Sequence, residues 1–361
     1  MDNTNNYVII MAGGIGSRFW PFSRTNHPKQ FQDILGTGKT LIQQTVDRFE
    51  SVCPQENIYV VTHQDYYDLV TEQLPFMQDE QILLEPVMRN TAPCIAYAAY
   101  KIAAKNPNAN LLVAPADHII TKEEEFVRIA TKALAVTAQE KHVLVTLGIK
   151  PSRPDTGYGY IQHMEGENLH HLLKVKTFTE KPNLEFAKGF LESGDYVWNA
   201  GIFIWHVSAI IQNFEEHLPD IGEAFAEISN SYYTEKEEEV IKTAYFQCRN
   251  ISIDYGIMEK AHDVYVFPCD FGWSDLGTWK SLFTLSEKNE DQNVLHGNVL
   301  TYDTKNCIVK TPDDRLVIVQ GLDNYIIVEK GNVLVICQKD QEQRIKQFVN
   351  DVKEKKGDKF C

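Results

Sequence analysis

Residues 7–24, YVIIMAGGIGSRFWPFSR, carry the strongest local indication of the fold class. The apolar run at 7–11 stops at Gly13 and Gly14, a pattern typical of a buried strand that leads into a glycine turn. Helical patterns separate this run from three similar apolar runs, at 58–62, 111–115 and 143–149. The alternation predicts an α/β fold with a mostly parallel sheet covered on both faces. Ligands bind such sheets beyond the carboxyl ends of the strands.

The helical pattern is clearest at residues 91–105 and 123–140. The first stretch begins with Thr91, which can cap a helix, and has Pro93 in its first turn. The second begins with three glutamates, and negative charge is favourable at a helix N-terminus. Both stretches place apolar residues on one face, so we expect them to pack on the sheet.

After about residue 290 the pattern changes to short alternating strands separated by turn residues. These strands are predicted at 298–302, 306–310, 315–319, 324–329 and 332–337. They indicate a separate small β domain that ends in a polar helix. The sequence therefore predicts a catalytic domain over residues 1–288 and a C-terminal β domain over residues 289–361.

Composition restricts the function classes. The chain has 361 residues, with 35 Lys and Arg against 50 Asp and Glu, a formal net charge of −15. Such a balance argues against binding to nucleic acid or an anionic membrane surface. The N-terminus lacks the features of a secretory signal, and the seven cysteines contain no C-x-x-C pair. We expect a cytoplasmic protein with reduced thiols, no membrane partner and no nucleic-acid partner.

The glycine turn is followed by the basic residues Arg18, Arg24 and Lys29. Backbone amides of such a turn can approach phosphate oxygens, and the cations add positive charge. The turn is not a dinucleotide fingerprint, because Phe19 stands where the third glycine belongs, nor a Walker loop, because Asp33 stands where that motif begins. A triphosphate cradle is the functional interpretation, and an ordinary surface loop is the alternative.

Two aspartates are candidate metal ligands. Asp117 follows the apolar run 111–115 directly, where a carboxylate could hold a Mg²⁺ ion that bridges phosphates. A turn or helix cap is its alternative role. Asp275 lies in GWSDLGTW, residues 272–279, and could supply a second carboxylate. Spacing alone does not show that the two aspartates meet.

Eight motifs together resemble the mannose-1-phosphate guanylyltransferases, also called GDP-mannose pyrophosphorylases. In chain order they are GGIGSRFWPFSR with PKQF (13–31), EPVMRNTAP (85–93), APADH (114–118), TGYGYI (156–161), FTEKP (178–182), WNAGIFIW (198–205), SIDYGIMEK (252–260) and GWSDLGTW (272–279). The resemblance implies a Rossmann-like nucleotidyltransferase domain with a mixed, mostly parallel sheet. It also implies a small C-terminal β domain of left-handed β-helix type.

The resemblance further implies roles for individual residues. By the pattern of the family, Gly13, Gly14 and Gly16 would wrap the nucleotide, and Ala12, Glu85 and Asn90 are further candidates for nucleotide binding. Arg18, Lys29 and Asp117 would be catalytic, and Asp117 and Asp275 would hold Mg²⁺. The sugar phosphate would be bound by Gly159, Glu180, Lys181 and Asn199.

The chemistry of the implied reaction agrees with these residue types. An oxygen of mannose 1-phosphate would attack the α-phosphorus of GTP in line, and pyrophosphate would leave. This nucleophile is already anionic, so the enzyme needs cations and positioning and requires no general base. We therefore expect Arg18, Lys29 and the two aspartates to converge around one metal-bound triphosphate.

The choice of base and sugar is less fully determined. Glu85 is the candidate guanine discriminator, because a carboxylate accepts from both N1–H and the N2 amino group. Asn90 either supports the base or ribose or is an ordinary residue at a helix N-terminus. Two alternatives stay open: a nucleotidyltransferase for a different sugar 1-phosphate, and a non-catalytic nucleotide-sugar sensor. GTP and mannose 1-phosphate are the expected partners, and a homodimer is possible.

Overall fold

The computed structural model describes residues 3–361, and the chain forms two compact units. The first unit contains the segment up to Gly13, Thr45–Ala116 and Ile120–Trp273. The second contains Gly14–Gln44, Asp117–Ile119 and Ser274–Cys361. The second unit thus combines the C-terminal region with the early segment that follows Gly13. The predicted domain division at residue 288 stays a prediction.

The first unit is built on a nine-stranded sheet with the strand order β3-β2-β1-β4-β9-β6-β10-β8-β7. The strands are β1 (Asn6–Met11), β2 (Ile58–His63), β3 (Ile82–Glu85), β4 (Asn110–Pro115), β6 (Leu144–Ile149), β7 (Tyr160–Leu169), β8 (Leu172–Thr179), β9 (Tyr196–His206) and β10 (Val264–Cys269). All four predicted apolar runs are strands. Pairing is parallel along β3-β2-β1-β4 and between β6 and β10, whereas β9 is antiparallel to β4 and β6. The sheet is therefore mixed.

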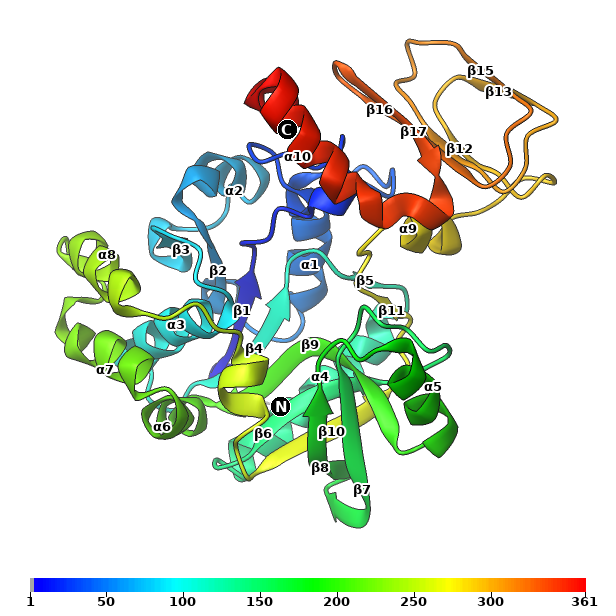
Figure 1. Cartoon of the computed structure of the whole chain (residues 1–361). Helices are drawn as coiled ribbons and strands as arrows, with labels where there is room; N and C mark the ends of the chain where they lie inside the picture. Colours follow the sequence, from blue (N-terminus) through cyan, green and yellow to red (C-terminus); the bar gives the residue numbers. More distant parts are fainter. Residues whose placement is uncertain (1–2) are drawn as a thin grey trace. The chain divides into compact units, whose positions relative to one another are not determined.

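Helices cover this sheet, and Figure 1 shows α3, α6, α7 and α8 grouped together. α3 (Thr91–Lys105) packs on β1, β2 and β3, whereas α4 (Glu123–Gln139) packs on β4, β6 and β9. Both predicted helices are thus present. The other helices are α1 (Leu41–Phe49), α2 (Tyr67–Gln73), α5 (Leu184–Ser193), α6 (Val207–His217), α7 (Pro219–Glu227) and α8 (Glu237–Gln247).

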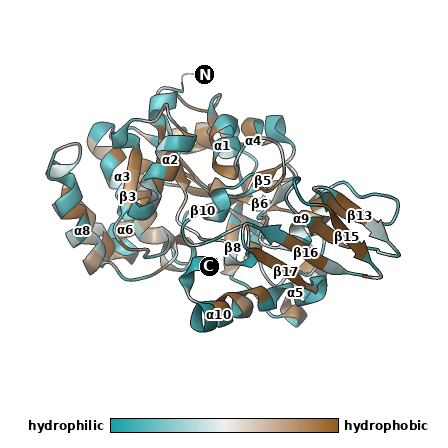
Figure 2. Cartoon of the chain, turned by 90° about the horizontal axis from the view of Figure 1, so that it is seen from above, coloured by the Kyte–Doolittle hydropathy of each residue, from teal (hydrophilic) through white to brown (hydrophobic). Residues whose placement is uncertain are grey.

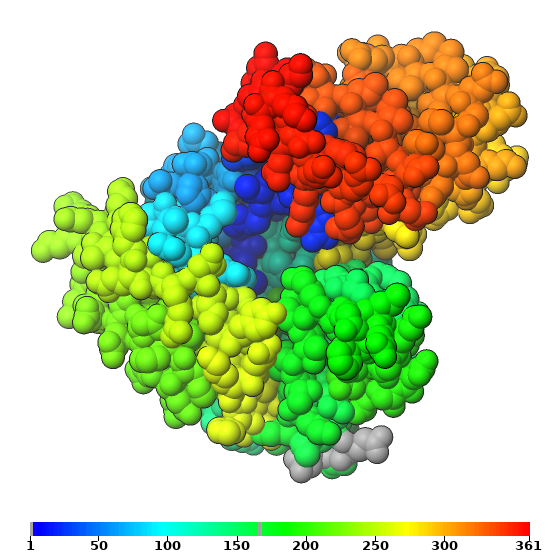
Figure 3. Space-filling model, in the orientation of Figure 1, coloured from blue at the N-terminus to red at the C-terminus, as the bar shows by residue number. Residues whose placement is uncertain are grey.

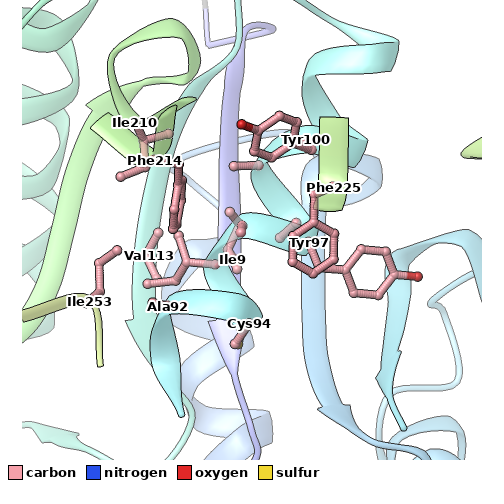
Figure 4. Close-up of a cluster of buried hydrophobic side chains, with 14 of the residues drawn as sticks. Ile9, Ala92, Cys94, Tyr97, Tyr100, Val113, Ile210, Phe214, Phe225 and Ile253 are labelled. Atoms are coloured by element: carbon pink, nitrogen blue, oxygen red, sulfur yellow. The ribbon is translucent and has the colours of Figure 1, made fainter. Parts of the chain in front are cut away.

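A large core of the first unit lies where α3 meets the sheet (Figure 4). Tyr97 and Tyr100 of α3 pack with Phe225 of α7, and the cluster also includes Ile9 of β1 and Val113 of β4. α3 is buried almost all around because α6 and α7 cover the face turned away from the strands. Helices enclosed in this way have no polar face.

The second unit contains a coil of short strands: β12 (Val294–His296), β13 (Val299–Tyr302), β14 (Ile308–Lys310), β15 (Val317–Gln320), β16 (Tyr325–Lys330) and β17 (Val333–Gln338). Successive strands alternate between two parallel sheets, β12-β14-β16 and β13-β15, and β17 pairs antiparallel with β16. This is the β-helix arrangement that the resemblance implies. Figure 2 shows how apolar these strands are.

Two helices, α9 (Trp279–Leu285) and α10 (Ile345–Lys356), complete the second unit, and Figure 3 shows α10 in red beside the orange strands. The second unit has its own hydrophobic core, and the segment that follows the glycine turn contributes to it. Phe19 and Trp20 are buried with Trp279 and with Ile326 of β16. Two short strands, β5 (Ile119–Ile120) and β11 (Trp273–Ser274), are also present. Within residues 3–361 no helix combines the length and apolar character of a membrane span, and all seven cysteines are free.

Candidate functional site

Lys29 is the centre of a cluster of charged residues in the second unit. Its Nζ lies 2.9 Å from Asp117 Oδ2 and donates hydrogen bonds to the backbone oxygens of Asp275, at 2.9 Å, and Leu276, at 2.8 Å. The Lys29 side chain is only 3% exposed. One buried ammonium thus joins Asp117 to the chain segment that carries Asp275. The segments of Lys29, Asp117 and Asp275, distant in the sequence, are therefore neighbours in the structure.

The glycine turn brings Lys29 to this position. Gly16 has φ 71°, and a Cβ there would lie 2.6 Å from Lys29 Cβ. The amide of Lys29 donates to the carbonyl of Ile15 at 3.2 Å. A side chain at position 16 would therefore both strain the backbone and displace the lysine. Gly14 is different, because a Cβ there would meet no atom within 4 Å.

Arg18 lies beside the same segment. Its Nη1 donates to the carbonyl of Gly277 at 3.4 Å, and Asp275 Oδ1 accepts from the amide of Gly277 at 3.0 Å. A Cβ on Gly277 would lie 2.5 Å from Asp275 Oδ2 and 3.3 Å from Arg18 Nη1. Gly277 therefore makes room for the carboxylate and the guanidinium at once. The second unit collects Arg18, Lys29, Asp117 and Asp275 around this segment.

The charge of Asp117 is set by its neighbours. Desolvation raises the pKa of its carboxyl, but Lys29 and the His118 ring, 4.0 Å from Asp117, lower it by more. The pKa of Asp117 consequently lies below its ordinary value, and the group is ionised at neutral pH. An ionised carboxylate is the form that binds a divalent cation.

This cluster fits a divalent metal ion. Among the described residues no three His, Cys, Asp or Glu side chains gather as a complete metal site. Mg²⁺ needs no such cage when substrate phosphates are present, because one or two carboxylates then suffice. Asp117 and Asp275 supply two carboxylates within one unit. Lys29 contacts the carboxylate of Asp117 and the backbone carbonyl of Asp275.

Glu85 is the centre of a second cluster, in the first unit. It is the last residue of β3, is 4% exposed, and accepts a hydrogen bond from the hydroxyl of Tyr245 at 3.2 Å. A Cβ on Gly13 would lie 3.3 Å from Glu85 Oε2. Burial raises the pKa of Glu85 to about 7, although the Tyr245 hydrogen bond opposes this shift. Reasoning from the sequence did not identify Tyr245, since nothing near it in the sequence points to Glu85.

Asn90 caps α3. Its side-chain oxygen accepts from the amide of Thr91 at 2.9 Å, and its backbone has φ 70°. The prediction that Thr91 caps this helix is therefore wrong. Thr91 is the first helical residue, and its hydroxyl accepts from the amide of Ile253 instead. A positive φ suits asparagine better than threonine, because β-branched residues are strained there.

Ala12 directly follows β1, and both its backbone amide and its backbone carbonyl form hydrogen bonds with β2. Its amide donates to Val61 at 2.8 Å, and its carbonyl accepts from the Thr62 hydroxyl at 2.9 Å. Ala12 therefore anchors the start of the glycine turn to β2.

A third cluster, also in the first unit, surrounds Asn199 of β9. Its Nδ2 donates to Asp254 Oδ1 at 2.7 Å, and its amide donates to the carbonyl of Gly159 at 2.8 Å. A Cβ on Gly159 would lie 2.5 Å from Glu180 Oε2. Gly159, Glu180 and Asn199 are therefore adjacent, as polar groups that bind one small molecule must be.

Charge in this third cluster is predominantly negative. Desolvation, followed by the nearby Glu180, raises the pKa of Asp254 to about 6. Lys181 has φ 45°, and its Nζ lies 2.8 Å from Glu180 Oε1 while its side chain is 60% exposed. An exposed lysine of this kind can reorient toward a phosphate at little cost.

Comparison with known proteins shows which families the chain resembles. The nucleotidyl transferase family matches residues 7–292, and a family described as MannoseP isomerase/GMP-like beta-helix domain matches residues 297–352. The mannose-1-phosphate guanylyltransferase of Salmonella montevideo is 38% identical over 353 residues, covering 96% of this chain and 73% of that protein. The alginate biosynthesis protein AlgA of Pseudomonas syringae is 37% identical, covering 96% and 71%.

A solved structure is similar over nearly the whole chain. It is named mannose-1-phosphate geranyltransferase from Thermus thermophilus, has a TM-score of 0.85 and 30% identity, and the match covers 97% of this chain and 100% of that one. The nucleotidyl transferase family generally uses a divalent metal ion, which the Asp117 and Asp275 carboxylates suit. The eight motifs, the sheet with its β-helix and these similarities lead to one assignment: the chain belongs to the nucleotidyl transferase family, among the mannose-1-phosphate guanylyltransferases.

Proposed function

We propose that this chain transfers GMP from GTP to α-D-mannose 1-phosphate, giving GDP-mannose and pyrophosphate. The relatives named mannose-1-phosphate guanylyltransferase support the reaction. The observation that carries it is the buried ammonium of Lys29, which is held by Asp117 and by the segment of Asp275. Positive charge fixed beside two carboxylates suits a metal-bound triphosphate.

In the proposed reaction, a phosphate oxygen of mannose 1-phosphate attacks the α-phosphorus of GTP. One P–O bond forms as the bond to the pyrophosphate oxygen breaks, and the leaving group carries away the charge. Lys29 and Arg18 offset repulsion between the two anions and the charge that develops on the phosphoryl oxygens. The nucleophile is ionised before it attacks, so none of these residues needs to remove a proton.

The proposed cofactor is Mg²⁺, held by Asp117 and Asp275 together with phosphate oxygens. When bound, it polarises the phosphoryl group and neutralises charge on the leaving pyrophosphate. Asp117 would exchange contact with Lys29 for contact with the ion, which leaves the ammonium available to the phosphates. We expect a chelator to abolish turnover and added Mg²⁺ to restore it; activity that persists with chelator would contradict this role.

For base recognition we propose Glu85, with its carboxylate accepting from guanine N1–H and from the N2 amino group. Gly13 supports this role, because its lack of a side chain leaves room at Glu85 Oε2. Gly14 and Gly16 would let backbone amides approach the triphosphate, and Ala12 would set the start of that turn. Asn90 would contribute to nucleotide binding indirectly, by capping helix α3.

For the sugar we propose that Glu180 and Asn199 bind hydroxyl groups and that Lys181 binds the phosphate. Gly159 supports the assignment, since a side chain there would fill the space beside Glu180. Asp254 orients the Asn199 side chain by accepting a hydrogen bond from Asn199 Nδ2 at 2.7 Å. Asn199 Oδ1 then accepts from the backbone amide of Gly201 at 3.0 Å. Such polar groups suit a hexose, and the identity of the hexose rests on the relatives.

The proposal is tested by pyrophosphate release from purified protein with Mg²⁺. GTP, ATP and UTP would each be combined with the 1-phosphates of mannose, glucose and galactose, with Lys29→Met as the inactive control. We expect the pair GTP and mannose 1-phosphate to be used best. Preference for another sugar would establish the first alternative, and binding of GDP-mannose without turnover would establish a sensor.

The domain division, the cellular location and the oligomeric state are further proposals. A catalytic domain over residues 1–288 and a C-terminal β domain over 289–361 are supported by the two family matches. A cytoplasmic location is supported by seven free thiols, which persist in a reducing compartment. Cell fractionation tests it, and recovery of the protein outside the cytoplasm would contradict it.

A homodimer is proposed from the outer surface of β13 and β15. Leu300 and Ile318 are paired neighbours there, 47% and 62% exposed, and Tyr302 and Leu316 are exposed beside them. Exposed apolar patches often mark contacts between proteins. Sedimentation velocity should show a dimer that Ile318→Glu dissociates; a monomeric wild-type protein would contradict the proposal.

A further inference from the structure

Tyr245 reaches Glu85 from a distant part of the first unit. It lies on α8, is fully buried, and its hydroxyl donates to Glu85 Oε1 at 3.2 Å. The carbonyl of Pro93, the second acceptor, lies 3.4 Å away. A tyrosine hydroxyl has one proton, so these two oxygens share it and the carboxylate is the nearer acceptor.

The ring of Tyr245 is held independently of Glu85. It packs edge to face against Tyr97 of α3, with ring centres 6.2 Å apart, and against Phe225 of α7 at 5.6 Å. Three helices therefore fix the position of one hydroxyl group. A donor fixed by packing can orient a flexible acceptor, because the acceptor adjusts to it.

Glu85 has two carboxylate oxygens with different surroundings. Oε1 faces the Tyr245 hydroxyl, whereas Oε2 lies on the side of Gly13, where the chain carries no side chain. We propose that Tyr245 is a positioning residue for guanine selection, which holds Oε1 so that the carboxylate presents its free lone pairs to the base. This inference rests on the proposed role of Glu85.

The protonation of Glu85 supports this inference. Burial raises the pKa of Glu85 to about 7, and the Tyr245 hydrogen bond acts in the opposite direction. Cys94 of α3 is also titratable and lies near Glu85; burial raises the pKa of its thiol well above the ordinary value, so the thiol stays neutral. Without the tyrosine hydroxyl, Glu85 would hold its proton at higher pH. A protonated carboxyl accepts poorly from two donors at once.

The experiment compares Tyr245→Phe with Tyr232→Phe as the matched control. Tyr232 is also buried beside Tyr97, but its hydroxyl donates to the carbonyl of Phe225 at 3.0 Å and does not contact Glu85. The readout is kcat/KM for GTP and for ITP, which lacks the N2 amino group, between about pH 6 and about pH 9. The KM for mannose 1-phosphate and a thermal melt report on the fold.

For Tyr245→Phe we expect kcat/KM for GTP to fall about tenfold at neutral pH, with kcat at saturating GTP within about twofold of wild type. The preference for GTP over ITP should shrink, and the pH midpoint for GTP use should rise. Tyr232→Phe should change neither property. If the two variants have the same midpoint and the same base preference, the positioning role is wrong.

Glu85→Gln separates this inference from the proposed function. If Glu85→Gln keeps the wild-type preference for GTP over ITP, Glu85 does not read the base, and the proposed role itself fails. If Glu85→Gln loses that preference and Tyr245→Phe keeps it, only the inference about Tyr245 fails. Should Tyr245→Phe not fold, 3-fluorotyrosine in place of Tyr245 gives a more acidic hydroxyl. The pH midpoint should then fall, and an unchanged midpoint would overturn the inference.

Discussion

Lys29 and Asp117 form an ion pair in which Nζ and Oδ2 are 2.9 Å apart, although one residue follows the glycine turn and the other follows β4. The lysine is buried, whereas the aspartate side chain is 32% exposed. The aspartate can therefore meet a metal ion that arrives from solvent. The ammonium also donates to the backbone carbonyls of Asp275 and Leu276.

Asp117→Asn should lower turnover by at least about a hundredfold, because it removes a metal ligand and a negative charge beside Lys29. It should also destabilise the protein by about 2 kcal/mol, since the buried ammonium loses its charged partner. Pyrophosphate release and urea unfolding measure the two effects. Asp270→Asn is the control, because Asp270 forms an exposed ion pair with Lys122 at 2.9 Å. Equal stability losses in both variants would contradict the argument.

This ion pair also predicts the effect of acid. The pKa of Asp117 is lowered in the folded protein, so the pair contributes stability above the ordinary pKa of an unfolded aspartate. That contribution should disappear as pH falls through the lowered pKa. In Asp117→Asn, unfolding free energy should therefore depend less steeply on pH in the acid range. Urea unfolding at several acid pH values measures this, and identical slopes would argue against the pair.

Arg18 and Arg24 should separate catalysis from stability. The hydrogen bond from Arg18 to Gly277 is long, so Arg18→Ala should change Tm little. It should lower kcat about a hundredfold, because the proposed transition state loses a stabilising cation. Arg24 instead donates to the carbonyls of Pro21 and Lys330 and to Asn332 Oδ1. Arg24→Ala should therefore lower Tm and leave kcat nearly unchanged. The reverse pattern would mean that Arg24, not Arg18, meets the triphosphate.

Glu85 predicts a pH dependence for GTP binding. Because its pKa is raised to about 7, the carboxylate that accepts from guanine forms mainly above neutral pH. The KM for GTP should therefore rise as pH falls below about 7. In Glu85→Gln this rise should be much smaller, which separates it from titration of the GTP phosphates. A wild-type protein and a Glu85→Gln variant with parallel profiles would refute the role of Glu85.

Gly159→Ala should raise the KM for mannose 1-phosphate about tenfold or more, because the added Cβ would lie 2.5 Å from Glu180 Oε2 and displace it. The KM for GTP should change little. Gly189→Ala is the matched control, since a Cβ at this exposed position of α5 meets no atom within 4 Å. Alanine also suits a helix better than glycine, so this control should be slightly more stable. An unaltered sugar KM in Gly159→Ala would remove Gly159 from the site.

The sequence alone predicts several strands of the fold. Strands β1, β2, β4 and β6 coincide with the four apolar runs, because strands buried on both faces need continuous apolar sequence. The strand order was not readable. β9 lies between β4 and β6 and runs antiparallel to both, and such pairing depends on which distant segments compete for one sheet edge.

In the candidate site, too, some residues can be predicted from the sequence and others cannot. The motifs make Lys29, Asp117, Glu85 and Asn199 candidates, because each of these side chains has a recognisable chemical use. Tyr245 was not predicted, because its position on α8 is that of an ordinary buried aromatic residue. Its proposed role depends on a hydroxyl group that contacts Glu85 only after three helices have packed together.

Taken alone, the amino-acid order determined the α/β character, the position of the glycine turn and the residue types available for phosphate, metal and base. These properties follow from local spacing and from side-chain chemistry, which are present in the unfolded chain. Folding decided that Lys29 contacts Asp117, that Tyr245 contacts Glu85 and that Asn90 caps α3. Such contacts arise from burial and hydrogen bonding between distant segments, whose partners no local pattern specifies.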